Sequence, residues 1–414
     1  MRITFYSNFL NHHQLQFCMA MSELLEGKFI FVASQPIEEE QLKLGYEDMN
    51  SKYPFVLKTY TSEENHMKAK ELAEDSDIII FGSASIEYLK IRNKTGKPCF
   101  IYSERLFKPG LNRYMIRTYL AFLKRYMFLK SKNIYVLCAS NYTSNDFRKI
   151  GAYTGKYYKW GYFPPNYSYE IKELMQRKEN KLTPVILWVG RFIPLKHAET
   201  AILTANALAK KNIDFEMRMI GDGPLRQEIE SMIEVYGLKE KIHILGSMSP
   251  QNVRKNMEEA DVFLFNSDYN EGWGAVVNES MNSGCAVVVS HAIGSAGFLI
   301  KNGFNGIIYP FGEQDEVDYW TELLIRNKQF RENLGENAYR TIHDTWNARQ
   351  GAIRFLKLCD NILNYQNSSP FETGPCSAAL CCSNNRFGND VRKELMRMKE
   401  YEGIDSTINS LYRN

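Results

Sequence analysis

Short apolar runs alternate along this chain with stretches that have the hydrophobic period of an α-helix. In the first third of the chain, such runs occupy residues 3–7, 28–33, 78–82, 99–103 and 134–140. Each run is bounded by polar turns, and helical sequence separates it from the next. This alternation predicts a parallel β-sheet flanked by helices, a fold of the α/β class.

The same alternation starts again in the second half of the chain. The later runs occupy residues 185–190, 215–220, 241–245, 262–265 and 286–289. Between the two series lies YYKWGYFPP at 157–165, whose aromatic residues, glycine and prolines are typical of an ordered hinge. Two such series in 414 residues predict two Rossmann-like domains, 1–164 and 165–345. We expect a helix over 346–365, followed by a flexible tail over 366–414 that contains a short helix.

Glycines and cations follow two of the strands predicted in the second domain. Gly190 and Arg191 end the run at 185–190, and Lys196 stands five residues later at the entrance to a helix. Gly221 and Gly223 flank an aspartate directly after the run at 215–220. Ligands of parallel α/β sheets bind at the carboxyl ends of the strands, where two cations can neutralise a diphosphate. Ordinary surface charges and a tight strand-to-helix turn are the alternative interpretation.

The segment DYNEGWGAVVNESMNSGCAVVVS, residues 268–290, combines an acidic loop with glycines, a predicted helix and a β-rich run. Gly272 and Glu279 are seven residues apart, so a helix that included both would place them about 20° apart around its axis. The unpaired amides of a helix start attract phosphate, and a carboxylate can bind a vicinal diol. With Glu271 just before the glycines, the segment predicts a sugar-nucleotide site, although the spacing alone also fits a solvated loop.

A series of motifs stands in this chain in the order VGR with Lys196, GDGP, ILG at 244–246, EGWGAVVNE and NGFNG. This series resembles the motif set of glycosyltransferase family 4. The resemblance is strong over 185–310 and weak before it. It implies a retaining enzyme of GT-B fold, in which two Rossmann-like domains face an interdomain cleft. The second domain of such enzymes binds a nucleoside diphosphate sugar, and the first holds most of a hydroxyl acceptor. No metal or other cofactor is implied.

The resemblance also implies a role for each matching residue. Arg191 and Lys196 would bind the diphosphate and stabilise the leaving group, and Glu271 would orient the transferred hexose. Glu279 would hold the ribose, and the backbone at Leu245 and Gly246 would border the base. The remaining donor-side positions are Gly190, Gly221, Gly223, Gly272, Trp273, Gly274 and Ala275.

The first domain departs from the family pattern in two places, and these define the expected acceptor or sugar side. Where many members carry a glycine pair after the first strand, this chain has Asn11, His12 and His13. Asn11 as a helix cap beside exposed histidines is an equal alternative. After the run at 99–103, Ser103, Glu104 and Arg105 stand where a histidine is common, and a structural ion pair is the alternative.

For two other features of the sequence, a role in ligand binding is considered. Phe298 stands where the family commonly has a glutamate. Asp75-Ser76-Asp77 matches a pattern by which other glycosyltransferases bind a divalent cation. Because it precedes a strand rather than following one, it is interpreted as a helix-to-strand turn.

The stretch 106–132 contains no acidic residue and interleaves seven lysines and arginines with aromatic and apolar side chains. Such a stretch fits peripheral contact with an anionic membrane and a lipid-linked glycan acceptor, or else an ordinary domain helix with a solvated basic side. Nucleic acid is a poorer partner because no recognition motif accompanies the charge.

Eight cysteines without a CxxC pair fit a reducing cytoplasm, and no run is apolar enough to span a bilayer. The usual role of members of the resembled family and the basic stretch favour polysaccharide or glycolipid biosynthesis at the inner face of a bacterial membrane. Two other functions stay open at this point. One is a sugar-nucleotide epimerase or phosphorylase of the same architecture. The other is a non-catalytic sugar-nucleotide-binding module.

Overall fold

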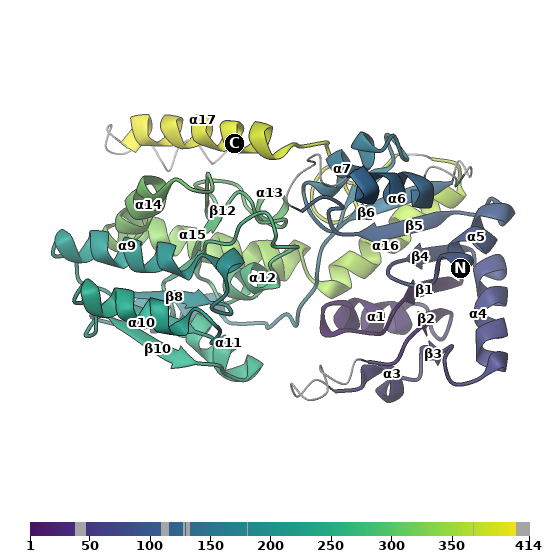
Figure 1. Cartoon of the computed structure of the whole chain (residues 1–414), viewed down its shortest axis with the longest axis horizontal. Coiled ribbons are helices and arrows are strands. Elements are labelled where there is room, and N and C mark those ends of the chain that lie inside the picture. The colour runs from purple at the N-terminus through teal and green to yellow at the C-terminus, as the bar shows by residue number, and fades with distance from the viewer. Residues whose placement is uncertain are drawn as a thin grey trace. The chain divides into compact units, whose positions relative to one another are not determined.

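Seven parallel strands form the sheet of the first domain in the computed structural model (Figure 1). The structure describes residues 1–37, 47–108, 116–126, 129, 133–179, 181–366 and 368–402. The sheet order is β3-β2-β1-β4-β5-β6-β7. The strands are β1 (Ile3–Ser7), β2 (Phe29–Ala33), β3 (Val56–Lys58), β4 (Ile78–Phe81), β5 (Cys99–Ser103), β6 (Ile134–Cys138) and β7 (Tyr157–Lys159). Every residue of the central strands β1 and β4 is buried, because helices cover both faces of a parallel sheet.

Helices connect these strands, and one helix from much later in the chain joins them. They are α1 (His12–Leu24), α3 (Met49–Lys52), α4 (Glu63–Asp75), α5 (Ile86–Thr95), α6 (Ile116–Tyr126), α7 (Thr143–Lys149) and α16 (Ala348–Leu363). Phe355 of α16 packs edge-on against Phe17 of α1 and Phe100 of β5, with ring centroids 6.1 and 4.9 Å apart. The first domain therefore comprises residues 1–165 and 347–381.

A second parallel sheet, of six strands in the order β10-β9-β8-β11-β12-β13, forms the other domain. Its strands are β8 (Val185–Val189), β9 (Glu216–Ile220), β10 (Ile242–Gly246), β11 (Val262–Phe265), β12 (Ala286–Ser290) and β13 (Ile307–Tyr309). Its helices are α8 (Ile171–Glu179), α9 (Ala198–Lys210), α10 (Arg226–Val235), α11 (Pro250–Glu259), α12 (Ala275–Asn282), α13 (Ala296–Leu299), α14 (Gln314–Arg326), α15 (Lys328–Arg340) and α17 (Asn384–Glu402). This domain comprises residues 166–346 together with the chain from 382 onward.

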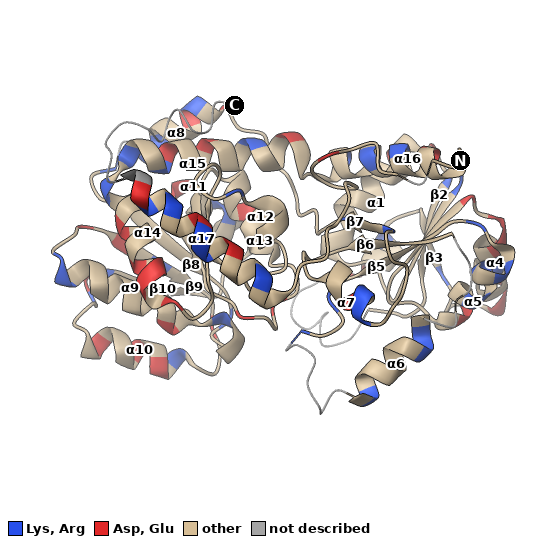
Figure 2. Ribbon diagram, turned by 90° about the horizontal axis from the view of Figure 1, so that it is seen from above, with Lys and Arg blue, Asp and Glu red and all other residues tan. Residues whose placement is uncertain are grey.

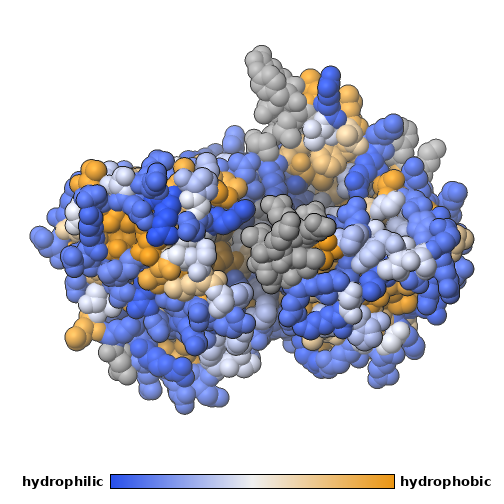
Figure 3. Space-filling view, turned by 60° about the horizontal axis from the view of Figure 1, so that its bottom comes forward, coloured by the Kyte–Doolittle hydropathy of each residue, from blue (hydrophilic) through white to orange (hydrophobic). Residues whose placement is uncertain are grey.

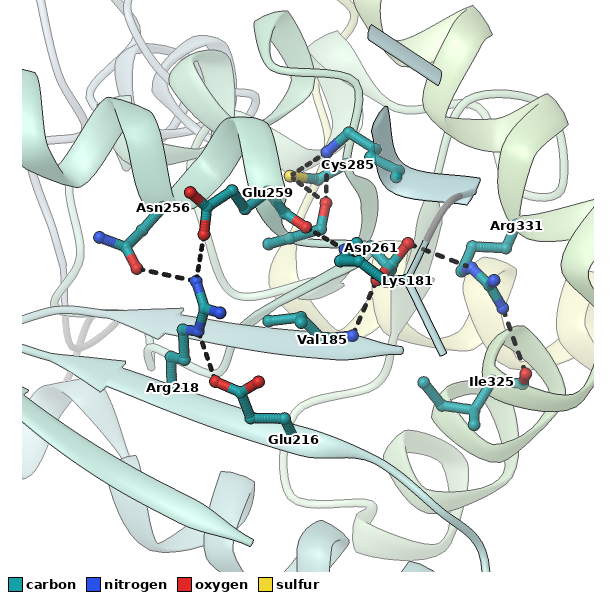
Figure 4. Close-up of polar contacts among 12 residues, drawn as sticks. Lys181, Val185, Glu216, Arg218, Asn256, Glu259, Asp261, Cys285, Ile325 and Arg331 are labelled. Atoms are coloured by element: carbon teal, nitrogen blue, oxygen red, sulfur yellow. Dashed lines mark hydrogen bonds and ion pairs between the residues drawn. The ribbon is translucent and has the colours of Figure 1, made fainter. Parts of the chain in front are cut away.

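Polar contacts fix the amino ends of the central strands in the second domain (Figure 4). Asp261, which precedes β11, accepts hydrogen bonds from the backbone N-H of Val185, at the start of β8, and from Lys181, at 2.8 and 2.7 Å. Arg331 of α15 lies 3.8 Å from its other carboxylate oxygen. These contacts lie at the opposite edge of the sheet from the ends where ligands of such folds bind.

The strands predicted from apolar runs are all present, with ends that differ by one or two residues. Three short strands, β3, β7 and β13, were not predicted. β7 lies inside the aromatic segment 157–165, which was expected to be a hinge. Its tyrosines are buried in the sheet, so the aromatic residues there serve the core of the first domain. Asp75-Ser76-Asp77 joins α4 to β4, as interpreted from the sequence, and Asp77 accepts a hydrogen bond from Arg2 N at 2.7 Å.

The tail prediction requires correction, because Ser, Asn, Gly and Cys after residue 366 suggested a loose linker. Residues 376–379 instead pair with the edge strand β7: Lys159 N donates to Ser377 O at 2.7 Å, and Ala379 N donates to Tyr157 O at 2.9 Å. Backbone pairing does not depend on apolar side chains, so composition gave no sign of it. The helix expected within the tail is α17, which is 19 residues long.

On the face shown in Figure 3, hydrophilic side chains predominate and apolar ones form small separate groups, as is usual for a protein surface.

Candidate functional site

Glycine backbone gathers where β8, β9 and β10 end. Gly190 N donates to Ile220 O at 3.0 Å, and Gly221 N donates to Gly246 O at 2.9 Å. Gly221 has a φ of +140°, and a Cβ added there would overlap the carbonyl oxygen of Gly190. A Cβ added at Gly223 would lie 2.5 Å from Phe192 O. These turns therefore require glycine, and they bring the predicted positions 190, 221 and 246 together on neighbouring strands.

Lys196 and Glu271 form an ion pair beside this backbone. Lys196 ends a short 3-10 helix, Pro194–Lys196, and its aliphatic chain runs 3.5 Å from the Cβ position of Gly190. Its Nζ lies 4.8 Å from the ring centroid of Phe265, at the end of β11. Both paired side chains are 15% exposed, so a bound anion would reach a partly desolvated lysine. Arg191, which was predicted to bind the diphosphate together with Lys196, is exposed at the end of β8.

The turn that carries Glu271 is held against the segment around Lys196. Asp268 N donates to Leu195 O at 3.0 Å, and the Asp268 carboxylate lies 3.5 Å from His197 Nε2. A hydrogen bond with Glu199, at 2.7 Å, raises the pKa of His197 and so favours its charged form. The sequence does not single out His197. Its only signal is its position next to Lys196, because its left-handed backbone, with φ +47°, cannot be predicted from residue type.

The start of α12 differs from the prediction. Gly274 is the N-cap, with a left-handed φ of +81°, and the helix begins at Ala275. A left-handed residue cannot continue a right-handed helix, so Gly272 lies outside it and the expected alignment of Gly272 with Glu279 is wrong. Ala275 and Glu279, four residues apart, share a face instead. The first-turn amides and the carboxylate therefore still lie on one side of α12.

Trp273 contributes backbone, not side chain, to this region. Its indole is buried and donates to Asn278 Oδ1 at 2.8 Å, and its ring lies 6.3 Å from that of Phe298. Phe298 stacks on Trp346 at 6.3 Å with the planes 14° apart. The phenylalanine found in place of the family glutamate therefore belongs to an aromatic cluster of the second domain.

Glu279 is half-buried and lies about one turn beyond Ala275, the first residue of α12. Burial raises the pKa of its carboxyl, and the Arg254 guanidinium opposes this shift. Arg254 donates to the Glu279 carbonyl at 2.9 Å, which ties α11 to α12. Leu245, whose backbone was predicted to border the base, lies at the end of β10, and its apolar side chain is exposed.

In the first domain, the predicted acceptor-side residues His12, His13 and Glu104 form one cluster with Tyr162, which follows β7. The ring of His13 stacks on Tyr162 at 4.5 Å, and Tyr162 donates its hydroxyl hydrogen to Glu104. The same carboxyl group lies 3.0 Å from Lys108 Nζ. Burial lowers the pKa of His13 to about 3, and His12 adds to this shift. Tyr162 and Lys108 were not predicted as site residues.

The structure decides two alternatives left open by the sequence. Asn11 caps α1, because its side chain accepts hydrogen bonds from the backbone N-H groups of His13 and Gln14, both at 3.1 Å. The Arg105 side chain is 2% exposed, and its Nε lies 3.8 Å from buried Asp146. Placing Arg105 on the acceptor side is therefore wrong, since its guanidinium is buried as one half of an ion pair in the interior.

Ser103 ends β5 beside this buried pair. Its hydroxyl donates to Glu104 O at 2.7 Å. Its backbone carbonyl accepts a hydrogen bond from Ala139 N at 2.9 Å. Ser103 thus connects the first-domain cluster to the residue that follows β6.

Part of the basic stretch 106–132 lies outside the described residues. The part that is described includes α6, where Ile116 and Leu120 are 58% and 56% exposed. Its lysine and arginine residues appear in blue in Figure 2. Within the described ranges, no helix is both long and apolar enough to cross a membrane. In the same ranges, no three His, Cys, Asp or Glu residues are arranged to hold a metal ion.

The part of the chain that matches a known family model lies in the second domain. Residues 171–341 match the family model "Glycosyl transferases group 1". The chain is 30% identical over 166 residues to alpha-D-kanosaminyltransferase of Streptomyces kanamyceticus, covering 40% of this chain and 42% of that protein. It is 28% identical over 186 residues to an undecaprenol-linked-glycan alpha-1,4-N-acetyl-D-galactosaminyltransferase of Campylobacter jejuni, covering 44% and 48%. The chain thus spans less than half the length of these two relatives.

A solved structure supports the fold over nearly the whole chain. The crystal structure of Anabaena Alr3699/HepE in complex with UDP aligns with a TM-score of 0.61 at 15% identity, covering 88% of this chain and 99% of that one. With the two parallel α/β domains, this likeness confirms the predicted GT-B fold class. The expected relationship to glycosyltransferases is confirmed for residues 171–341 at the level of group 1. Family 4 and stereochemistry stay predictions.

Proposed function

We propose that this chain is a glycosyltransferase that moves a hexose-type sugar from a nucleoside diphosphate sugar to a hydroxyl acceptor with retention of anomeric configuration. One observation carries the proposal: the Lys196–Glu271 ion pair lies beside the glycine backbone of Gly190 and Gly221. Cation, carboxylate and bare backbone in one place fit a diphosphate joined to a sugar. The family match over 171–341 supports the same function.

The proposed reaction uses the donor's own phosphate. The bond between the anomeric carbon and the diphosphate oxygen breaks, and Lys196, Arg191 and nearby amides stabilise the charge left on the diphosphate. The acceptor oxygen bonds to the same face of the anomeric carbon, and its proton passes to the departing phosphate. Glu271 orients the sugar, and Glu279, on the face of α12 shared with Ala275, binds the ribose hydroxyls. We propose no resident metal or other cofactor for this step.

The acceptor side is proposed from the first domain. Hydrogen-bonding groups come from Glu104 after β5, His13 at the start of α1 and Tyr162 after β7. The exposed apolar residues and cations of α6 favour an acceptor presented at an anionic membrane, such as a lipid-linked glycan. The relative from Campylobacter jejuni, whose name includes an undecaprenol diphosphate glycan, supports this class of acceptor.

The proposal is tested by binding first and by transfer second. Thermal-shift measurements with UDP, GDP, ADP and dTDP should show a rise in Tm with at least one of them, because a ligand that binds the folded state stabilises it. UDP is the first probe, since the aligned Anabaena structure holds it. Donor is then incubated with and without hydroxyl acceptors, and NMR of the product gives the anomeric configuration.

Arg191→Ala should abolish transfer without unfolding the chain, and Lys255→Ala, which also removes an exposed cation from the second domain, should leave transfer unchanged. Donor isomerisation without acceptor would indicate an epimerase. Phosphate-dependent breakdown of a glycan would indicate a phosphorylase. Nucleotide binding with no reaction across the acceptor panel would indicate a binding module.

A further inference from the structure

Helix α17 packs on the second domain beside the turn that carries Glu271. Val391 and Leu395 of this helix are 2% and 1% exposed. Its polar side chains hold it in place as well: Asn302 donates to Glu394 at 2.9 Å, and Lys399 lies 2.7 Å from Glu316. Figure 1 shows α17, in yellow, running along this domain near α14 and β12. Such a set of contacts fixes the helix at a defined place.

Gly388 is the point where α17 meets His291, the residue that follows β12. A Cβ added at Gly388 would lie 2.8 Å from Nε2 and 3.3 Å from Cε1 of this imidazole. Phe387 lies against the same ring, with centroids 6.1 Å apart. His291 is 3% exposed. A side chain at position 388 would therefore require the helix or the ring to move.

Two further contacts of the His291 ring lead toward the turn of Glu271. The backbone N-H of Phe311 donates to Nδ1 at 2.8 Å, so the neutral ring carries its hydrogen on Nε2. Nε2 lies 2.8 Å from the hydroxyl of Tyr269. The Tyr269 ring also packs edge-on against Phe311 at 5.8 Å. The imidazole thus bridges α17 and Tyr269.

Tyr269 lies within the tight turn that ends at Glu271. Glu271 N donates to Asp268 O at 3.1 Å, which closes the turn over Tyr269. On one side the turn is held to Leu195 through Asp268 N, and on the other it is held to His291 through the Tyr269 hydroxyl. Gly272, the next residue, is also held, because its carbonyl accepts a hydrogen bond from Gly294 N at 3.1 Å. Losing the Leu195 or the His291 anchor would therefore loosen the segment that aims the Glu271 carboxylate.

We propose that His291, pinned by α17 at Gly388, is a positioning residue that fixes the 268–271 turn through Tyr269 and thereby sets the place of the Glu271 carboxylate. This inference rests on the proposed function, in which Glu271 orients the transferred sugar. It adds to that function a role for α17, a helix beyond the segment matched by the family model.

The linkage can be disturbed from either end. Gly388→Leu adds a side chain against the imidazole, and since leucine favours a helix more than glycine does, any effect cannot come from a weaker α17. Tyr269→Phe removes only the hydroxyl that meets Nε2. Asn385→Leu is the matched control, because it places the same side chain on an exposed position of the same helix.

Hydrogen exchange of the 414-residue, ligand-free chain tests the linkage directly. We expect peptide amides of residues 268–272 to exchange about tenfold faster in Gly388→Leu and in Tyr269→Phe than in the wild type. Exchange of the amides in β8 should be unchanged in both variants. In Asn385→Leu, exchange of the 268–272 amides should be the same as in the wild type. Equal exchange of the turn in all four proteins would overturn the proposal, as would faster exchange spread over the whole second domain.

Kinetics test the consequence for catalysis. Since Glu271 is proposed to contact the sugar, both variants should lower kcat about ten- to hundredfold, whereas the Kd for UDP should change less than twofold. Unchanged kcat, or an equal loss of UDP affinity, would contradict a positioning role. If the wild type binds none of the four nucleotides, the proposed function has failed, and the exchange comparison still decides the linkage.

Discussion

Lys196 and Glu271 form a partly buried ion pair across 75 residues of sequence, each side chain being 15% exposed. The aliphatic chain of the lysine runs beside the backbone of Gly190, at the end of β8. A diphosphate can displace the Glu271 carboxylate from Lys196, because the lysine then exchanges one negative partner for another.

Replacing Lys196 should therefore affect transfer far more than folding. In Lys196→Ala we expect kcat for sugar transfer to fall by about 100-fold or more, since one preorganised contact to the leaving group is lost. Tm should fall by only a few degrees, because the pair is only partly buried and water can hydrate the remaining Glu271 carboxylate. Steady-state kinetics and thermal unfolding measure the two effects. Transfer at half the wild-type rate would contradict the assigned role.

Gly221→Ala should unfold or distort the turn after β9. The added Cβ would overlap the Gly190 carbonyl, so the strand ends must separate and nucleotide affinity should be lost. Gly237→Ala is the control: its φ is +67° and nothing lies within 4 Å of the added Cβ, so it isolates the backbone cost of about 1 kcal/mol. Urea unfolding and UDP titration compare the two variants, and equal effects would refute steric crowding.

The parts of the fold that the sequence predicted correctly are those governed by local pattern. Buried strands such as β4 appear as continuous apolar runs, and the glycines after β8 and β9 mark turns that need close backbone approach. By contrast, the start of α12 depends on the left-handed conformation of Gly274. The same residue type also occurs inside helices, as Gly388 does, so glycine alone does not locate a boundary.

Contacts between distant residues account for what the sequence did not reveal. His291 and Tyr162 each acquire a role only through partners that the fold supplies, Gly388 in one case and Glu104 in the other. Arg105 shows the reverse: a polar strand end suggested a ligand contact, but Asp146, 41 positions later, turns it into a buried pair. No local period encodes such pairings.

Asp146→Asn tests whether Arg105 is structural. Burial raises the pKa of the Asp146 carboxyl, and the Arg105 charge opposes this shift. Removing the negative charge leaves a buried guanidinium without its counter-charge, so we expect a loss of about 3 kcal/mol of unfolding free energy. Glu23→Gln, which breaks the exposed pair with Arg349, should cost less than about 1 kcal/mol. A stable Asp146→Asn protein with impaired acceptor binding would contradict this assignment.

Helix α6 should bind anionic membranes if the proposed acceptor is lipid-linked. Sedimentation with vesicles of phosphatidylglycerol and phosphatidylcholine should carry down the wild type, and binding should weaken as salt rises. Leu120→Ser should reduce the bound fraction several-fold, because it removes an apolar side chain that is 56% exposed. Met396→Ser on α17, where the side chain is 61% exposed, serves as the control. Equal binding of both variants would exclude α6 as the contact.

The pH dependence of stability should report the burial of His291. Burial lowers the pKa of this imidazole to about 4, and the charge of Arg392 adds to the effect. In the unfolded chain the pKa of a histidine is about 6.5, so below that pH the unfolded state binds a proton that the folded state does not. The stability contributed by the neutral ring is complete above pH 6.5 and is lost as pH falls toward 4. At pH 5 the loss amounts to about 2 kcal/mol.

A His291→Gln variant has no such titration, whereas its other ionisable groups are the same as in the wild type. The difference in Tm between wild type and variant should therefore shrink as the pH is lowered from 7 to 5. Differential scanning calorimetry at both pH values measures it. A constant difference would mean that this imidazole is solvated or charged in the folded state, and the packing of Gly388 against it would then be in error.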